Sequence, residues 1–267
     1  MTSAPPAPPR AVLLDHGGVV VRSVKDPDGL ARFATGVHQM LADAGAEVPD
    51  EAELLADIQA GLDCYKSWKN GNVRRPHPRE IGHREFWVEL VAADWPEAAR
   101  TLVGAEATPL CRAMVESRGS KELGPGMREF FEFCAQAGVR TGIVANTMVG
   151  AINRDLARAW GTEKYLAVQV HSDETGIRKP DPEAIWLATR ALDLEPAQVW
   201  FVGDNYDRDV RCARRAGVGR AVLMRPPDQV EPSTRPQPDD VVSDGFGLTE
   251  LLRAAVQGAT EDKGGKA

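Results

Sequence analysis

The sequence contains little of what marks disulfide-rich, zinc-binding or membrane proteins. The four cysteines, Cys64, Cys111, Cys134 and Cys212, are far apart in a chain of 267 residues. None of them forms a pair with metal-binding spacing, so we expect small buried residues in a reducing compartment. No run approaches the ~18 apolar residues of a membrane span, and the proline-rich start lacks the pattern of a signal peptide. These absences predict a cytoplasmic protein without a membrane partner.

The sequence also has no excess of positive charge. Its 32 Lys and Arg residues against 39 Asp and Glu residues give a formal net charge of -7. Binding to nucleic acid or to an acidic membrane surface needs a basic surface, so we expect neither. With 43% hydrophobic and 27% charged residues, the chain has the composition of a globular protein with a full core.

Five short apolar runs have the length and composition of buried strands. The predicted strands cover residues 11–14, 139–144, 165–170, 199–202 and 220–224. Helical patterns lie between the later runs, and this alternation predicts parallel pairing with right-handed crossovers. The predicted fold class is therefore α/β, with a Rossmann-like parallel-sheet core.

The connection after the first predicted strand breaks this alternation. It is far longer than a crossover requires, and it contains amphipathic helical patterns around Phe33, Ile58 and Trp87. Ligands of open parallel sheets bind beyond the carboxyl ends of the strands, so an insert that leaves from that edge would cover the site. We therefore predict an α/β core of residues 10–22 and 118–256 and a helical cap of residues 23–117.

Three further segments are predicted from composition. Residues 1–9 and 257–267 have few apolar side chains, so both are expected to be disordered tails. Residues 225–240 include five prolines and are expected to form a loop. A closing helix over residues 248–256 is expected to follow it.

Polar residues follow the predicted strands at their carboxyl ends. Asp15 follows the first strand, Asn146 and Thr147 follow the second, and Asp204 follows the fourth. Lys179 lies in a loop that should reach the same edge. Such a set suits Mg²⁺ beside a phosphate, because the metal prefers oxygen ligands and a phosphoryl group binds cations and N–H donors. The predicted cofactor is Mg²⁺, and the predicted partner is a small phosphorylated metabolite.

Four motifs, in this order, resemble the haloacid dehalogenase superfamily. They are Asp15-His16-Gly17-Gly18-Val19, Lys179-Pro180-Asp181-Pro182, Gly203-Asp204, and Asp209 followed by Ala213 and Ala216-Gly217. The helical insert after the first strand resembles the cap of that superfamily. The resemblance covers residues 10–20 and about 120–252, and it implies a phosphatase.

The resemblance also implies a role for each motif residue. Asp15 would be the nucleophile that attacks phosphorus and forms an aspartyl-phosphate, which water then hydrolyses. Mg²⁺ would be held by Asp15, Asp204 and the backbone carbonyl of Gly17. Lys179 would hold the phosphoryl oxygens. Asp209 would orient Lys179 or a metal-bound water, or would alternatively be an exposed residue at a helix start.

Gly17 departs from the pattern of the family's phosphatases. They usually carry a second aspartate at this position, which protonates the leaving group and then activates water. Such proton transfer is worth about 10²–10⁴-fold in rate, so its loss would slow the enzyme. The candidate substitutes are His16, His77, His83 and Tyr65.

Ala145 is the second departure. The family usually has a Ser or Thr there, whose hydroxyl binds phosphate. Asn146 and Thr147 follow at once, and their amide, hydroxyl and backbone N–H groups are the predicted replacements. Alternatively, Thr147 is the N-cap of the next helix.

The segment of residues 66–79 has five basic residues and no acidic one. Within it, Arg74, Arg75 and Trp68 are predicted to contact a second anionic group or a base on the substrate. The alternative is a solvated polar loop.

The favoured function is that of a Mg²⁺-dependent phosphatase. The first alternative is a non-catalytic relative that binds a phosphorylated ligand or a partner protein, which Gly17 and Ala145 support. The second is a metal-independent, dehalogenase-type hydrolase in which Asp15 attacks carbon, and Asp204 and Asp209 argue against it. The protein is expected to be a monomer or a homodimer.

Overall fold

A six-stranded parallel sheet forms the core in the computed structural model, which describes residues 7–230 and 236–264. The strand order is β5-β4-β1-β6-β7-β8, and every neighbouring pair is parallel. The strands are β1 (Ala11–Leu14), β4 (Arg140–Ala145), β5 (Leu166–His171), β6 (Val199–Gly203), β7 (Arg220–Met224) and β8 (Asp240–Val242). The predicted α/β class with a Rossmann-like sheet is confirmed, and β1 lies at the centre of the sheet.

Helices cover both faces of the sheet, which is why its strands are apolar throughout rather than alternating. On one face, Val12 and Leu14 pack in a cluster with α6 and α11. On the other face, Ala11 and Leu13 pack in a cluster with α9 and α10. The bounds are α6 (Met127–Gln136), α9 (Glu183–Ala191), α10 (Arg211–Ala216) and α11 (Gly245–Gly264), and α7 (Gly150–Ala159) follows β4. The sheet is thus fixed from both sides, and its carboxyl edge is a rigid base for a site.

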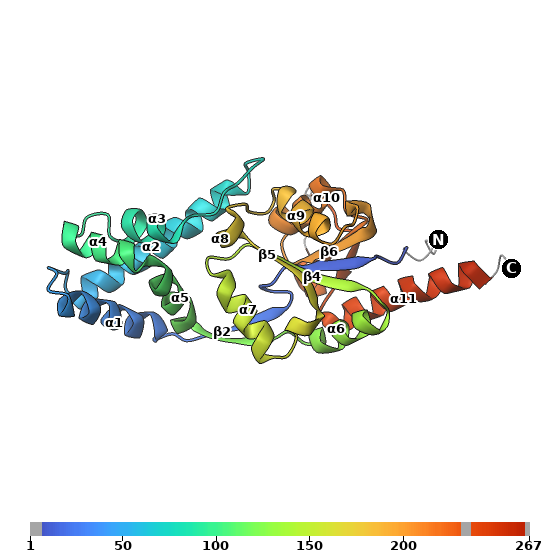
Figure 1. The fold of residues 1–267 in the computed structure, drawn as a ribbon, viewed down its shortest axis with the longest axis horizontal. Coiled ribbons are helices and arrows are strands. Elements are labelled where there is room, and N and C mark those ends of the chain that lie inside the picture. Colours follow the sequence, from blue (N-terminus) through green and yellow to red (C-terminus); the bar gives the residue numbers. More distant parts are fainter. Residues whose placement is uncertain (1–6, 231–235, 265–267) are drawn as a thin grey trace.

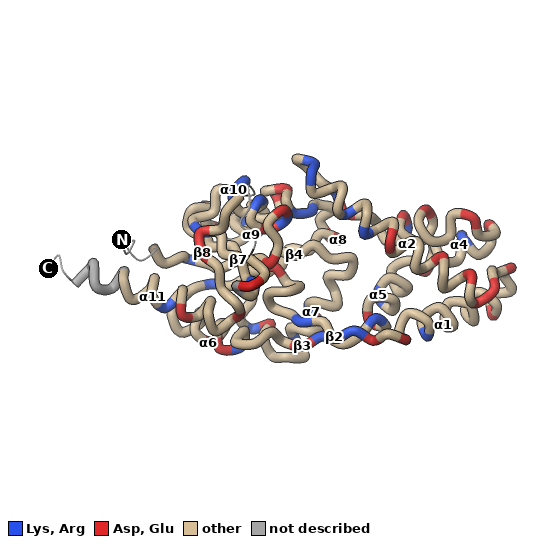
Figure 2. Tube along the Cα trace, turned by 180° about the vertical axis from the view of Figure 1, so that it is seen from behind, with Lys and Arg blue, Asp and Glu red and all other residues tan. Residues whose placement is uncertain are grey.

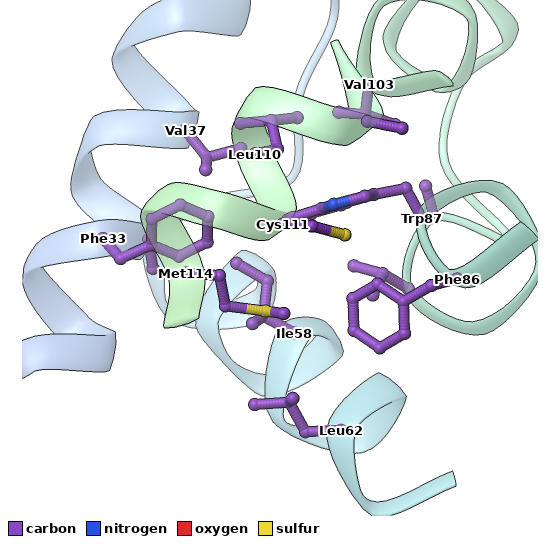
Figure 3. Packing of buried hydrophobic residues seen from close by; sticks show 14 of the residues in the cluster. Phe33, Val37, Ile58, Leu62, Phe86, Trp87, Val103, Leu110, Cys111 and Met114 are labelled. Atoms are coloured by element: carbon purple, nitrogen blue, oxygen red, sulfur yellow. The ribbon is translucent and has the colours of Figure 1, made fainter. Parts of the chain in front are cut away.

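A separate lobe of helices, which we call the cap, lies at one end of the elongated molecule (Figure 1). It contains α1 (Gly29–Asp43), α2 (Glu51–Asn72), α3 (His83–Glu85), the π-helix η1 (Phe86–Val91), α4 (Glu97–Ala105) and α5 (Ala107–Ser117). An apolar cluster fills the cap, and Phe33, Ile58 and Trp87, one from each of three predicted helical patterns, are buried in it (Figure 3). Met148, Val149 and Ile152 from the α/β core also belong to this cluster. Burial of each such side chain stabilises the fold by about 1.5–3 kcal/mol.

A two-stranded antiparallel ribbon, which the sequence analysis did not predict, joins the cap to the core. β2 (Val21–Lys25) leaves the core and β3 (Gly119–Leu123) returns to it. Of the five residues of β2, the first is buried and the other four are exposed, so the ribbon has no apolar run. The predicted boundary between residues 22 and 23 falls inside β2.

Two predictions near the carboxyl terminus need correction. Residues 257–264, expected to be disordered, continue α11. Once a helix has begun, each added residue gains a hydrogen bond, and Ala, Glu and Lys are good helix formers. Asp240, expected to end a loop, is the first residue of β8, an edge strand too short for an apolar-run signal. The predictions for residues 1–6, 231–235 and 265–267 lie outside the described residues.

Within the described ranges, no helix combines the length and the apolar character that crossing a membrane requires.

His171, the last residue of β5, is completely buried, and neither ring nitrogen makes a hydrogen bond within the described structure. Burial, together with the charge of Arg154, lowers the pKa of His171 to about 4. The pKa in the folded state therefore lies below that in the unfolded state. The stability from a neutral His171 is present above pH 6.5 and is lost as the pH falls toward 4.

We therefore expect His171→Leu to reduce the acid sensitivity of the fold. Between pH 7 and pH 4, the free energy of unfolding should fall by about 3 kcal/mol less in the variant than in the parent protein, since one pKa unit is worth about 1.4 kcal/mol. Urea unfolding at several pH values measures this difference. His38→Leu, at a half-buried position on α1, is the control. Equal falls in the parent and His171→Leu would contradict the expectation.

Candidate active site

Three carboxylates meet at the carboxyl ends of β1 and β6. Asp15 follows β1, Asp204 follows β6, and Asp209 lies in the π-helix η4 (Tyr206–Val210) just beyond. One oxygen of each carboxylate lies within 4.8 Å of the others. Because β1 and β6 are paired neighbours in the sheet, residues far apart in sequence are brought to one point.

Lys179 is buried between two of these carboxylates. Its Nζ lies 2.8 Å from Asp15 Oδ1 and 2.7 Å from Asp209 Oδ1. Burial opposes the charge of the amine, but Asp15 and Asp209 together raise the pKa of Lys179. Burial would likewise raise the pKa of Asp209, but Arg208 and Lys179 lower it to about 2. Lys179 and Asp209 are therefore both charged at neutral pH.

Arg208 contacts all three carboxylates, and the sequence analysis did not predict it. Its Nη2 lies 2.9 Å from Asp15 Oδ2, 2.6 Å from Asp204 Oδ1 and 3.0 Å from Asp209 Oδ2. Burial opposes its charge, but the three carboxylates raise the pKa of Arg208. A basic residue inside the acidic run 204–209 was the available signal for it.

The cluster has three negative and two positive charges, and so an excess of one negative charge. Burial, followed by repulsion from Asp15, raises the pKa of Asp204 to about 6. Carboxylate oxygens this close together suit Mg²⁺, which prefers hard oxygen ligands. The residues present therefore fit the metal, but the Arg208 guanidinium contacts the same three carboxylates.

The turn after β1 passes close to Asp204. Gly18 has a φ of +82°, and a Cβ built on it would lie 2.3 Å from Asp204 Oδ2. This close approach explains the glycine. At Gly17, by contrast, a Cβ would meet no atom within 4 Å.

A cavity of about 480 Å³ lies between the cap and this edge of the core. Arg208, Asn146 and Thr147 line it from the core, and Tyr65 and Lys69 line it from α2. Its volume is typical of a site for a small molecule. The carboxylate cluster adjoins the cavity through Arg208.

The family model of the haloacid dehalogenase-like hydrolases matches residues 9–217. The chain belongs to this family. It is 26% identical over 255 residues to phosphoglycolate phosphatase 1 of Pseudomonas aeruginosa, covering 94% of this chain and 81% of that protein. It is 29% identical over 255 residues to N-acetylmuramic acid 6-phosphate phosphatase of Pseudomonas putida, covering 93% and 98%.

Among solved structures, a 2-haloacid dehalogenase from Pseudomonas syringae pv. tomato is similar with a TM-score of 0.59 and 22% identity. The match covers 91% of this chain and 97% of that chain. At this identity the likeness shows the fold alone. The match of the family model confirms the predicted resemblance to the haloacid dehalogenase superfamily.

In this haloacid dehalogenase-like hydrolase, Asn146 and Thr147 use their side chains locally. The Asn146 amide donates to the Lys179 carbonyl at 2.9 Å and accepts from the Lys179 N–H at 2.8 Å. Thr147 Oγ1 accepts from the Val149 N–H at 3.1 Å, and the Thr147 N–H donates to Ser172 Oγ at 2.9 Å. The Asn146 side chain thus fixes the backbone of Lys179, and the Thr147 hydroxyl holds the N–H of Val149 just before α7. Both residues line the cavity, and their use in binding phosphate stays a prediction.

Two of the four candidate proton donors are buried and poorly suited to the role. Burial, followed by the charge of His171, lowers the pKa of His16 to about 3, so His16 is neutral at pH 7. The Tyr65 hydroxyl donates to Glu80 Oε1 at 3.0 Å. Burial and the charge of Glu80 raise the pKa of Tyr65.

The other two candidates make contacts through one ring nitrogen, in His77, or through both, in His83. His77 Nδ1 lies 3.0 Å from Asp181 Oδ2, and the ring is largely exposed. His83 Nε2 donates to the Met148 carbonyl at 2.6 Å, and its Nδ1 accepts from the Thr108 hydroxyl at 2.9 Å. His83 thus connects the cap to the loop after β4.

Arg74, Arg75 and Trp68 are not among the described residues that line the cavity. Arg74 and Arg75 are exposed just beyond the end of α2. Figure 2 shows basic residues in blue along the segment that projects where α2 ends. Trp68 stacks on Tyr65 with ring centroids 6.1 Å apart. Because α2 ends at Asn72, the two arginines lie beyond the helix that lines the cavity, and their contact with substrate stays a prediction.

We expect Arg208→Gln to bind Mg²⁺ more tightly than the parent protein. The substitution removes a positive charge that contacts all three carboxylates. At an effective dielectric constant of about 20, a unit charge at about 4 Å contributes about 4 kcal/mol, so we expect the affinity for Mg²⁺ to rise about tenfold or more. Isothermal titration calorimetry measures it directly.

Arg211→Gln is the matched control for this titration. Arg211 lies beside the same segment but pairs with Asp207, at 2.6 Å. The Arg211→Gln substitution therefore removes one positive charge, as Arg208→Gln does, but leaves the carboxylate cluster unchanged. An equal gain in both variants, or none in Arg208→Gln, would show that Arg208 does not compete with the metal.

Proposed function

We propose that this hydrolase is a Mg²⁺-dependent phosphatase of small phosphorylated metabolites. The observation that carries the proposal is the position of Asp15, a buried carboxylate at the end of the central strand. The ammonium of Lys179 contacts one of its oxygens, and Asp204 belongs to the same carboxylate cluster. The names of the two sequence relatives, both phosphatases, support it.

In this proposal a carboxylate oxygen of Asp15 attacks phosphorus. The bond between phosphorus and the ester oxygen breaks, and that oxygen leaves as part of the alcohol. The aspartyl-phosphate is then hydrolysed by water, which divides one difficult displacement into two. Attack by a carboxylate on a phosphate dianion is opposed by like-charge repulsion. Lys179 reduces that repulsion because its ammonium contacts Asp15.

The surrounding residues hold Lys179 in place before substrate arrives. Asp209 is fully buried and contacts Nζ at 2.7 Å, which fixes the ammonium. Asn146 bonds both the N–H and the carbonyl of Lys179, which fixes the backbone. Such positioning lowers the reorganisation needed during phosphoryl transfer.

Asp15, Asp204 and the backbone carbonyl of Gly17 would hold Mg²⁺. When bound, the metal would neutralise charge on the phosphoryl oxygens. Asp209 would remain with Lys179, and Arg208 would give up its contacts with Asp15 and Asp204.

A non-catalytic relative that binds a phosphorylated ligand is the second candidate function. Gly17 and Ala145 favour it, since both positions lack the side chains usual in the family's phosphatases. A screen of phosphate esters with Mg²⁺ decides between the two, because binding without release of phosphate supports the second candidate.

We also propose that the protein is cytoplasmic and forms a monomer or a homodimer. All four cysteines are free thiols, three of them buried, which suits a reducing compartment.

Asp15→Asn should abolish phosphate release, because an amide is a poor nucleophile and loses the charge that Lys179 contacts. Chelation of the metal should have the same effect. Release of inorganic phosphate from a panel of esters is the measurement, and Asp94→Asn, an exposed cap position, is the control. Turnover retained after either treatment would contradict the proposed mechanism.

Gly17→Asp should increase turnover. A side chain fits at this position, since a Cβ there meets no atom within 4 Å. The new carboxyl group would supply a proton donor, so we expect kcat to rise at least about tenfold. Gly17→Asn has the same shape without the transferable proton and is the matched control. If Gly17→Asp is no faster than Gly17→Asn, the parent protein already has an adequate donor.

A further inference from the structure

The cavity between cap and core is lined by more basic than acidic side chains. Lys66 and Lys69 come from α2, Arg118 from the residue between α5 and β3, and Arg178 from the loop before Lys179. Asp63 is the acidic residue on this wall. With Arg208 from the core, five positive charges line the cavity against one negative charge, so the lining has the opposite sign to the net charge of the whole chain, which is -7.

Arg178 and Arg208 are already paired with carboxylates, whereas the other three cations are not. Arg178 forms a buried ion pair with Glu80. Lys66, Lys69 and Arg118 have no ion pair with any residue in ranges 7–230 and 236–264. The Lys69 ammonium instead lies 4.4 Å from the centre of the Tyr65 ring.

Lys69 is half-buried in surroundings that oppose its charge. Burial, followed by the charge of Arg178, lowers the pKa of Lys69 to about 8. Arg118 and Arg208 add further repulsion, and Glu80, which is attractive, is paired with Arg178. An anion beside Lys69 would relieve this repulsion.

The anion beside Lys69 is not the phosphoryl group that reacts, because in the proposed mechanism that group lies against Asp15 and Lys179. Lys66 and Lys69 belong to the cap, on the other wall of the cavity. Arg118 joins them from the position between α5 and β3. An anion bound there is thus separate from the phosphoryl group that reacts.

We propose that Lys66, Lys69 and Arg118 form a subsite for a second anionic group of the substrate, a carboxylate or a second phosphoryl group. This inference rests on the proposed phosphatase function and narrows its substrate class. The preferred substrates are phosphate monoesters that carry another negative charge within the reach of a small metabolite.

Pairs of esters that differ in one anionic group test the subsite. 3-Phosphoglycerate is compared with glycerol 3-phosphate for the carboxylate, and fructose 1,6-bisphosphate with fructose 6-phosphate for the second phosphoryl group. Lys69→Met removes the charge and keeps much of the chain length. It should raise KM at least about tenfold for the member with the extra anion and less than about twofold for the other.

Two further variants separate charge from structure. Lys69→Arg keeps the charge and should retain the preference for the extra anion. Lys25→Met is the matched control, since Lys25 is exposed on β2 and does not line the cavity among the described residues. It should leave both KM values unchanged.

Ligand-induced shifts of the melting temperature give a readout that does not need turnover. A larger shift of the melting temperature with the ester that carries the extra anion, lost in Lys69→Met, supports the subsite. If no ester is hydrolysed but this difference is seen, the proposed phosphatase function fails and the subsite stands. Hydrolysis with equal KM changes for both members of each pair overturns the subsite and leaves the function standing. No preference for the extra anion in either assay also overturns the subsite.

Discussion

Compensation of buried charge at the end of the central strand is the constraint on which the site depends. Asp15 is fixed there by the sheet, and an isolated carboxylate in such a place would be strongly disfavoured. Lys179 supplies the balancing charge, and Asp209 and Arg208 complete the cluster. Removal of one partner leaves an uncompensated charge, so the loops that carry these residues must fold to the same point. The chemistry proposed for Asp15 uses the same arrangement.

The cap is connected to this cluster through the loop that carries Lys179. Arg178 pairs with Glu80 from the cap side, and the backbone of residues 78–80 bonds to that of residues 176–178. Substrate that binds against α2 is therefore close to the segment that positions Lys179. Binding energy from a second anionic group on the cap could in this way be used at the reacting centre, which is the usual means by which remote contacts increase kcat.

The strand-end residues of the site could be predicted from sequence, because the carboxyl ends of parallel strands lie at one edge of the sheet however the side chains pack. That rule predicts Asp15 and Asp204, and Lys179 was predicted from a loop expected to reach the same edge. Arg208 was not, since the direction of a long side chain depends on packing that no spacing encodes. The same reason explains why Arg74 does not line the cavity among the described residues. The run of basic residues is visible in the sequence, but the position at which α2 ends decides which of them reach the cavity. The ribbon of β2 and β3 was missed because exposed strands carry no apolar pattern.

The central claim is that Asp15 carries the phosphoryl group between the two steps. Acid quenching during turnover, followed by mass spectrometry of the peptide that contains Asp15, tests it most directly. The account predicts a phosphorylated peptide in the parent protein and none in Asp15→Asn. Release of phosphate from an ester while Asp15 remains unmodified at every quench time, in Gly17→Asp as well as in the parent protein, would contradict it.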